Sequence, residues 1–151
     1  MIDGTPLEIG ERIDGNWSTV DTERVLARWL RLLIAHTQVD AVVCQNDAMA
    51  IGALRALRAA AVAMGRADLR EIPVFGCDGL PDVGRRLADE GQLAGTVIVP
   101  TPSAAAVAAV VSALNGGPAL AEEIKLPPAA YPPLLGRGSD ARQETAAGST
   151  R

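Results

Sequence analysis

The chain has 151 residues, 48% of them hydrophobic, a size and composition that suit one folded domain with its own core. Its net charge of -4 comes from 14 basic and 18 acidic residues spread along the sequence, so nothing indicates a nucleic-acid partner. The longest apolar stretches, such as 104–114, are shorter than a membrane span and lack the basic flank of a signal peptide, so we expect no export signal in this chain.

The first part of the chain predicts an edge strand followed by an amphipathic helix. Residues Leu7 to Ile13 alternate apolar and polar side chains, which is a weak strand pattern. The loop Asp14–Trp17 follows. Ser18-Thr19-Val20-Asp21 is similar to a capping box, and the residues after it place apolar and arginine side chains on opposite faces of a helix that is expected to reach about His36.

A second strand runs directly into a helix at the stretch that organises the chain. Residues 41–44 are an apolar run of strand length, and Gln45-Asn46-Asp47 interrupts it with polar side chains. Small and apolar residues then continue at helical spacing to Gly65, a predicted C-cap. We expect Asn46 or Asp47 to open this helix, and we interpret Asp47 as an N-cap rather than as a ligand-binding group.

The remaining pattern alternates strands and helices. We expect strands at Ile72–Cys77 and Leu93–Val99, a short helix between Pro81 and Gly91, and a helix from Thr101-Pro102 to Asn115. Residues Glu123 to Leu126 are a possible fifth strand, and we expect disorder from about Gly136 onward.

This alternation indicates the α/β class. It predicts a parallel sheet of about five strands, with right-handed crossovers and helices on both faces. All strands then end at one edge of the sheet, which is where open parallel sheets bind ligands. That edge collects the Asp14–Trp17 loop, Asn46, Asp78 and Thr101.

Three residues at the edge are candidates for ligand binding. Asn46 can donate and accept hydrogen bonds, Asp78 accepts them, and Trp17 offers a flat apolar face, a combination that suits sugars. Each residue also has a purely structural interpretation. Asp78-Gly79 is a common turn dipeptide, and Trp17 could pack as a hydrophobic staple before a Ser18 cap. Together on one edge, the three residues favour binding.

Neither catalysis nor a cofactor is indicated. The spacing of Cys and His residues fits no metal site, and the glycine-rich nucleotide motifs are missing from the sequence. Cys44 and Cys77 each end an apolar run, which predicts two free thiols rather than a disulfide. We therefore expect a protein that is not an enzyme.

Three segments resemble the type I periplasmic sugar-binding proteins of ABC importers. Gln45 to Leu57 resembles the family's polar turn and helix, Val74 to Pro81 its strand ending in Asp-Gly, and Gly91 to Val97 its Gly-x-Leu-x-x-Thr-Val strand. The resemblance covers about residues 7–128. It implies that residues 1–135 are a partial C-terminal lobe and that the N-terminal lobe is missing, while the composition of residues 136–151 predicts a disordered tail.

The resemblance also implies a function and a site. Asn46 and Asp78 match positions that hydrogen-bond sugar hydroxyls, and Trp17 matches an aromatic residue that often closes over the ligand. Val99 departs from the family, which often has a polar residue there. The implied function is non-enzymatic binding of a sugar or polyol for an ABC importer permease, in the periplasm or another extracytoplasmic place.

Two other functions fit the same pattern. The lobe recurs as the effector domain of LacI-type transcription regulators, for which a helix-turn-helix segment upstream would decide. A phosphoacceptor receiver domain has a similar size and strand order, with Asp14, Asp78, Thr101 and Lys125 in a suggestive sequence. A receiver needs an acidic cluster after its first strand, where Asp14 stands alone, so we place this alternative last.

Overall fold

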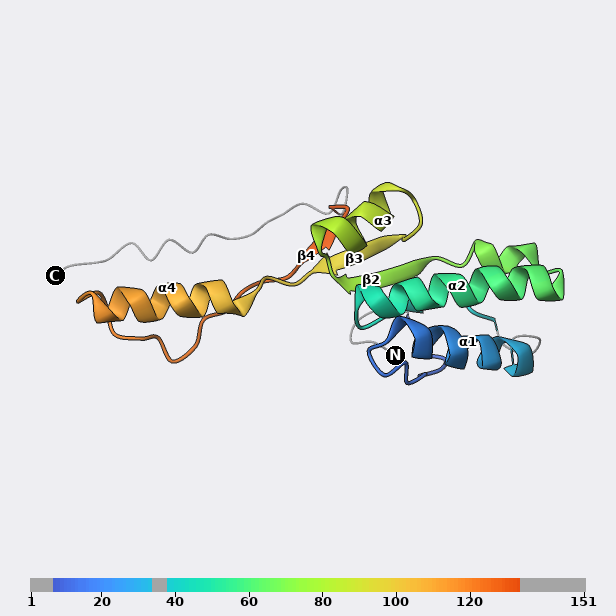
Figure 1. The fold of residues 1–151 in the computed structure, drawn as a ribbon, viewed down its shortest axis with the longest axis horizontal. Helices are drawn as coiled ribbons and strands as arrows, with labels where there is room; N and C mark the ends of the chain where they lie inside the picture. Colours follow the sequence, from blue (N-terminus) through green and yellow to red (C-terminus); the bar gives the residue numbers. More distant parts are fainter. Residues whose placement is uncertain (1–6, 34–37, 134–151) are drawn as a thin grey trace.

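The computed structural model describes residues 7–33 and 38–133. These residues form an α/β fold, as the sequence predicts, with helices packed on a small sheet (Figure 1). The expected end of the first helix near His36 and the tail from 136 onward lie outside the described residues. The elements in chain order are α1 (Thr19–Leu33), β1 (Val42–Val43), α2 (Asp47–Met64), η2 (Ala67–Arg70), β2 (Val74–Asp78), η3 (Pro81–Arg85), α3 (Arg86–Asp89), β3 (Gly95–Ile98), α4 (Pro102–Leu114) and β4 (Ala129–Tyr131).

The described strands form one sheet in the order β1-β2-β3-β4. β1, β2 and β3 are parallel, with Val43 opposite Phe75 and Asp78 opposite Ile98. β4 runs antiparallel to β3. The first three strands therefore end at a common edge, as predicted, whereas the last strand differs from the all-parallel expectation.

The helices α1, α2 and α3 lie on one face of the sheet. Val74 and Cys44, on the side of α2, are buried, whereas Val43, Phe75 and Val97 on the opposite side are 78%, 37% and 39% exposed. Right-handed crossovers that step in one direction across a sheet place their helices on the same face. Because β1, β2 and β3 follow one another in one direction, the described residues differ from the expectation of helices on both faces.

Small side chains let α1 and α2 pack side by side (Figure 1). Ala53 of α2 is fully buried, and a Cβ on Gly52 would overlap the backbone oxygen of Thr19. The Thr19 hydroxyl donates a 2.8 Å hydrogen bond to the carbonyl of Ala48, which ties the starts of the two helices together. The buried core consists of Leu26, Leu30, Cys44, Met49, Ala50, Ala53, Ala56, Leu57, Ala60, Ala61, Leu69, Val74, Leu87 and Leu93.

Two predicted strands are wrong. Residues Leu7 to Ile13 form no strand, and Leu7 and Ile9 are 59% and 49% exposed, because the alternating pattern has no neighbouring strand to pair with. The last strand begins at Ala129 rather than at Glu123. Pro127 and Pro128 lack the N–H group that a sheet ladder needs, so the pairing starts after them.

Several predicted boundaries are confirmed. Gly65 ends α2 in the left-handed conformation with φ 63°, and Pro102 begins α4 directly after Thr101. The Ser18 hydroxyl accepts a 3.3 Å hydrogen bond from the Asp21 N–H at the start of α1. Cys44 and Cys77 are both free, as predicted, and burial raises the pKa of the Cys44 thiol to about 11.

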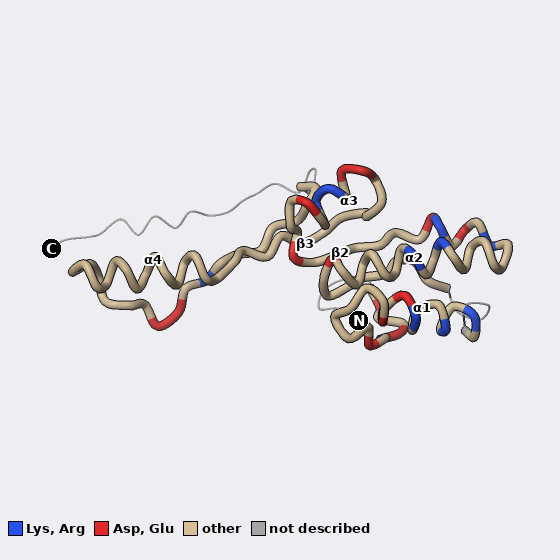
Figure 2. Tube along the Cα trace, in the orientation of Figure 1, with Lys and Arg blue, Asp and Glu red and all other residues tan. Residues whose placement is uncertain are grey.

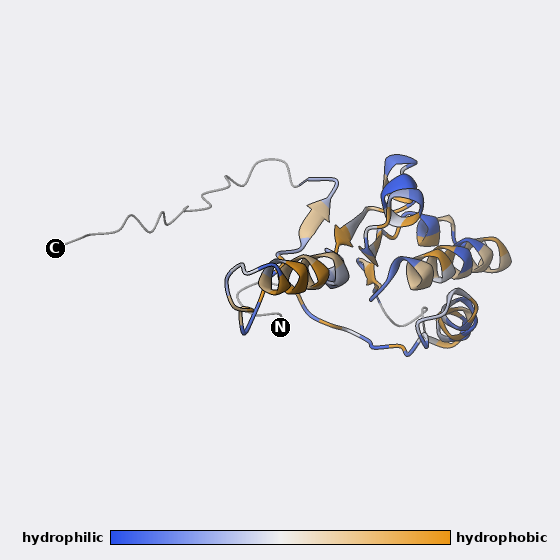
Figure 3. Ribbon diagram, turned by 60° about the vertical axis from the view of Figure 1, so that its left-hand side comes forward, coloured by the Kyte–Doolittle hydropathy of each residue, from blue (hydrophilic) through white to orange (hydrophobic). Residues whose placement is uncertain are grey.

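The helix α4 stands apart from the body of the molecule (Figure 1). None of its residues is buried, and it carries no charged side chain, whereas α1, α2 and α3 do (Figure 2). Figure 3 shows its hydrophobic character over most of its length. Within residues 7–33 and 38–133, no helix combines the length and apolar character needed to cross a membrane.

Candidate functional site

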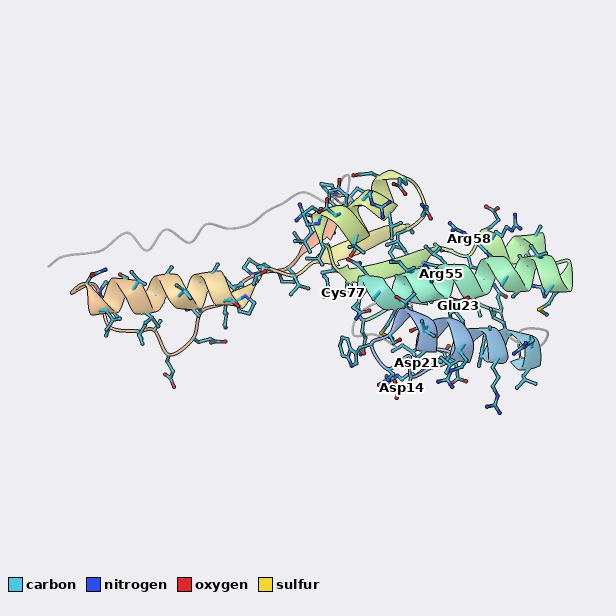
Figure 4. The ribbon with its side chains drawn as sticks, in the orientation of Figure 1. Asp14, Asp21, Glu23, Arg55, Arg58 and Cys77 are labelled. Carbon is cyan, nitrogen blue, oxygen red and sulfur yellow. The ribbon has the colours of Figure 1, made fainter. Side chains whose placement is uncertain are left out.

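The candidate residues gather where the parallel strands end. Val43 of β1 is opposite Phe75 of β2 in a parallel pair, so Asn46, which follows β1, and Asp78, which ends β2, lie at the same edge of the sheet. The loop before α1 reaches the same edge, because the starts of α1 and α2 are bonded together. Figure 4 shows this end of the body, with Cys77 near the end of β2 and Asp14 and Asp21 near the start of α1.

Asn46 is the N-cap of α2. Its Oδ1 accepts a 2.7 Å hydrogen bond from the N–H of Met49, and its Nδ2 donates a long, 3.5 Å bond to the carbonyl of Trp17. The expectation that Asp47 caps the helix is wrong, because the Asn46 backbone is extended and its side chain reaches Met49. The cap fixes the amide group at the sheet edge and leaves donor capacity toward solvent.

Trp17 projects from a tight turn. Asn16 and Trp17 both have left-handed backbones, with φ 50° and 55°. The turn is held by a 3.0 Å bond from the Ser18 N–H to the carbonyl of Gly15 and a 2.8 Å bond from the Asn16 N–H to Asp14 Oδ1. The Trp17 side chain is 65% exposed, so it does not act as a buried hydrophobic staple.

Asp78 presents an unpaired carboxylate at the end of β2. Among the described residues its side chain has no hydrogen-bond partner, while its carbonyl accepts a 3.2 Å bond from the N–H of Val99. Its φ of 100° is rare for a residue other than glycine. Partial burial, and then the negative charge of Asp47, raise the pKa of Asp78 above its ordinary value.

Val99 lies at the same edge and is 47% exposed. Its side chain offers no hydrogen bond, so this position contributes only an apolar surface. The receiver alternative also needs Asp14 and Lys125 at this edge of the sheet. The structure does not place them there as that alternative requires. Asp14 follows no strand, and Lys125 pairs with Glu123 in the segment between α4 and β4.

The sequence interpretation missed the environment of Asp47. This side chain is only 2% exposed and accepts hydrogen bonds from Thr96 and from the backbone of Gly79. Glycines at 76 and 84 in the following segments were the available signal, since an absent side chain leaves room for a neighbouring group.

Two hollows lie elsewhere on the described part of the chain. A hollow of about 270 Å³ lies at the other end of the strands, lined by residues such as Leu57, Ile72 and Gln92. A second, of about 440 Å³, lies between α1 and the segment 11–14. Neither hollow contains Trp17, Asn46 or Asp78.

The comparisons with known proteins assign the fold to a family. The family model described as "Periplasmic binding protein domain" matches residues 4–118. The chain belongs to this family. Within the family, it is 50% identical over 66 residues to the ribose import binding protein RbsB of Salmonella typhimurium, a match that covers 44% of this chain and 20% of that protein. It is 32% identical over 121 residues to the xylitol-binding protein of Mycolicibacterium smegmatis, covering 80% of this chain and 31% of that one.

Solved structures of periplasmic binding proteins share the fold. The binding protein of the arabinose ABC transporter from Shewanella sp. ANA-3, solved with L-arabinofuranose, has a TM-score of 0.62 and 25% identity, covering 78% of this chain and 37% of that one. The chain therefore spans about a fifth of the length of the ribose import binding protein and well under half of the solved protein.

Proposed function

We propose that this chain forms one wall of a sugar-binding site in a periplasmic binding protein that serves carbohydrate import. The observation that carries the proposal is the Asp78 carboxylate, which has no hydrogen-bond partner among the described residues and lies at the same sheet edge as Asn46 and the exposed Trp17. An unpaired carboxylate, an oriented amide and an exposed aromatic ring are the groups that vicinal hydroxyls and a sugar ring require.

Each residue has a separate part in binding. Asp78 accepts hydrogen bonds from two hydroxyl groups, and these are charge-assisted. The Asn46 Nδ2 group turns from its long bond with Trp17 to donate to a sugar oxygen. The Trp17 indole covers the apolar face of the ring. Val99 adds an apolar surface, which favours a ligand without a hydroxyl at that place.

The protein as a whole acts as a solute-binding protein and not as an enzyme. The relatives named above are import or sugar-alcohol binding proteins, which supports the importer over a transcription regulator. The same relatives support a periplasmic or other extracytoplasmic location and an ABC permease as partner. Residues 1–135 are assigned to a partial lobe, and a second lobe supplies the opposite wall.

A site with one wall binds weakly, because the outer face of the sugar stays in water. We expect the 151-residue chain to bind D-ribose no more tightly than roughly millimolar, about -4 kcal/mol. Titration of the ¹⁵N-labelled chain, followed by NMR, measures this affinity and locates the binding site.

Three variants test whether Asp78 contributes most to ribose binding. Asp78→Ala should abolish the ribose-dependent shifts, whereas Trp17→Ala should weaken them and Asn46→Ala should fall between the two. Glu71→Ala is the control, since Glu71 is an exposed acid at the other end of the strands. Equal binding by Asp78→Ala and the unaltered chain would move the site away from this edge.

A further inference from the structure

A buried carboxylate at the start of α2 bonds to β3 and to the turn after β2, beneath the candidate site. Asp47 is the first residue of α2, and its side chain is 2% exposed. Its Oδ1 accepts a 2.7 Å hydrogen bond from the hydroxyl of Thr96 in β3, and its Oδ2 accepts a 3.0 Å bond from the N–H of Gly79. Both oxygens are therefore used by the protein, out of reach of a ligand on the surface.

Two glycines provide the space for this carboxylate. A Cβ on Gly76 of β2 would overlap Asp47 Oδ1, and a Cβ on Gly84 of η3 would overlap Oδ2. The start of α2 also favours a negative charge, because the free N–H groups of a helix's first turn carry partial positive charge. The position is thus shaped for a carboxylate by the sheet, by η3 and by the helix.

The bond to Gly79 acts on the backbone that carries Asp78. The Gly79 N–H is held by Asp47, and the Gly79 carbonyl accepts a 2.7 Å hydrogen bond from Arg85 Nε. The carbonyl of Asp78 accepts its bond from Val99. The Asp78 side chain has no partner of its own among the described residues, so its place depends on this turn.

We propose that Asp47 is a positioning residue for the sugar site: its buried carboxylate holds the Asp78-Gly79 turn, and thereby the Asp78 carboxylate, without contacting the ligand. The role of this turn in binding rests on the proposed sugar site. The hold of Asp47 on the Asp78-Gly79 turn does not depend on that proposal. A residue held at φ 100° keeps that conformation only where its surroundings enforce it, and Asp47 supplies one of the bonds that do so.

Asp47 also sets the charge around Asp78. Its negative charge is one of the two causes that raise the pKa of Asp78. The charged groups that face the turn are Asp47 from α2 and Arg85 from η3. Loss of the Asp47 charge should therefore lower the Asp78 pKa.

Amide exchange in two variants separates positioning from stability. Asp47→Ala removes both bonds, whereas Thr96→Val removes only the Thr96 bond and leaves that of Gly79. The exchange rate of the Gly79 N–H is compared in each variant with that of Ala94, whose N–H bonds to Val74 in the same sheet. In Asp47→Ala we expect the exchange rate of the Gly79 N–H, divided by that of Ala94, to rise about tenfold or more above its value in the unaltered chain. In Thr96→Val we expect this ratio to stay unchanged.

A third variant covers the case in which Asp47→Ala does not fold. In Asp47→Asn the amide oxygen can still accept from Gly79 while its NH₂ donates to Thr96, so only the charge is lost. We expect Gly79 to stay protected and the Asp78 pKa, measured by ¹³C titration of its carboxyl carbon, to fall. The pKa should stay unchanged in Thr96→Val.

The outcomes distinguish this inference from the proposed function. Equal relative exchange of Gly79 in Asp47→Ala and Thr96→Val would overturn the positioning role. An unchanged Asp78 pKa in Asp47→Asn would overturn the effect of the Asp47 charge on Asp78. Neither readout requires sugar. If the unaltered chain shows no response to D-ribose while Gly79 is released in Asp47→Ala, the sugar site fails and the positioning of the turn stands.

Discussion

At the scale of single residues, Asp78 combines strain with an unfavourable charge. Its φ is 100°, and burial together with the charge of Asp47 raises its pKa. A left-handed backbone and a raised carboxyl pKa both lower stability. Both features therefore fit the proposed binding role of Asp78, which would come at some cost in stability.

Asp78→Asn should stabilise the chain at neutral pH. The folded state holds the Asp78 proton more tightly than the unfolded state does, so the ionised carboxylate lowers stability once the pH exceeds its ordinary pKa. Because the side chain is exposed, the gain should stay below about 1 kcal/mol. Urea unfolding at pH 7 and pH 3 checks this, since the gain should disappear at the lower pH, where Asp78 is protonated in both states. A variant less stable than the original at pH 7 would contradict it.

Gly84→Ala should destabilise the chain, although alanine favours helices. The new Cβ would overlap the Asp47 carboxylate, which two hydrogen bonds hold in place. We expect a loss of about 1–3 kcal/mol in the free energy of unfolding. Gly10→Ala is the matched control, because nothing lies within 4 Å of its added Cβ. Equal stabilities of the two variants would show that the carboxylate can move aside freely.

At the scale of elements, the junction of β1 and α2 holds both a helix cap and a residue of the proposed sugar site. Asn46 ends the strand region, caps the helix and presents its amide at the sheet edge. The two uses involve different atoms, since Oδ1 serves the cap and Nδ2 is available to a ligand.

Asn46→Ser should separate these two uses. Serine keeps the helix cap but has no amide N–H, so stability should change by only a few tenths of a kcal/mol while the ribose response weakens. Asn46→Ala should lose both, at about 1 kcal/mol of stability. Thermal unfolding and the ribose titration, measured together on both variants, make the comparison. A full ribose response in Asn46→Ser would remove the amide from the site.

The sequence predicted this junction because its signals are local. An apolar run, a polar turn and Gly65 at the helix end lie within one segment, and each acts on its neighbours. The role of Asp47 was not predictable in this way, since its partners Gly79 and Thr96 are 32 and 49 residues away. The strand expected at Leu7–Ile13 failed for a related reason, because alternation does not show whether a pairing partner exists.

At the scale of the whole molecule, two apolar surfaces formed by the described residues are exposed to solvent. One is the sheet face with Val43, Phe75 and Val97, and the other is α4, which has no buried residue. Exposed apolar surfaces of this kind promote association. We therefore expect the 151-residue chain to self-associate as its concentration rises.

Charges placed on α4 should reduce this association without harming the fold. Val107 and Val111 are 62% and 50% exposed and one helical turn apart, so Val107→Glu with Val111→Lys also adds a favourable pair. We expect a stability change within about 0.5 kcal/mol and a lower mean mass in sedimentation at high concentration. Val20→Lys, at an exposed valine on α1, is the control and should leave association unchanged. A loss of folding in the α4 variant would mean that α4 packs on the body.

The most direct test of the sugar site uses the two tryptophans of the chain. Trp17 is exposed at the sheet edge, whereas the Trp29 indole nitrogen is buried in α1 and without a partner among the described residues. Each gives a separate indole N–H signal in a ¹⁵N spectrum, so one titration with D-ribose contains its own control. The proposed site predicts that the Trp17 signal shifts with added ribose, that the Trp29 signal stays in place, and that Asp78→Ala abolishes the shift. A Trp17 signal that ribose leaves unmoved, or one that shifts equally in Asp78→Ala, would contradict a sugar site at this edge.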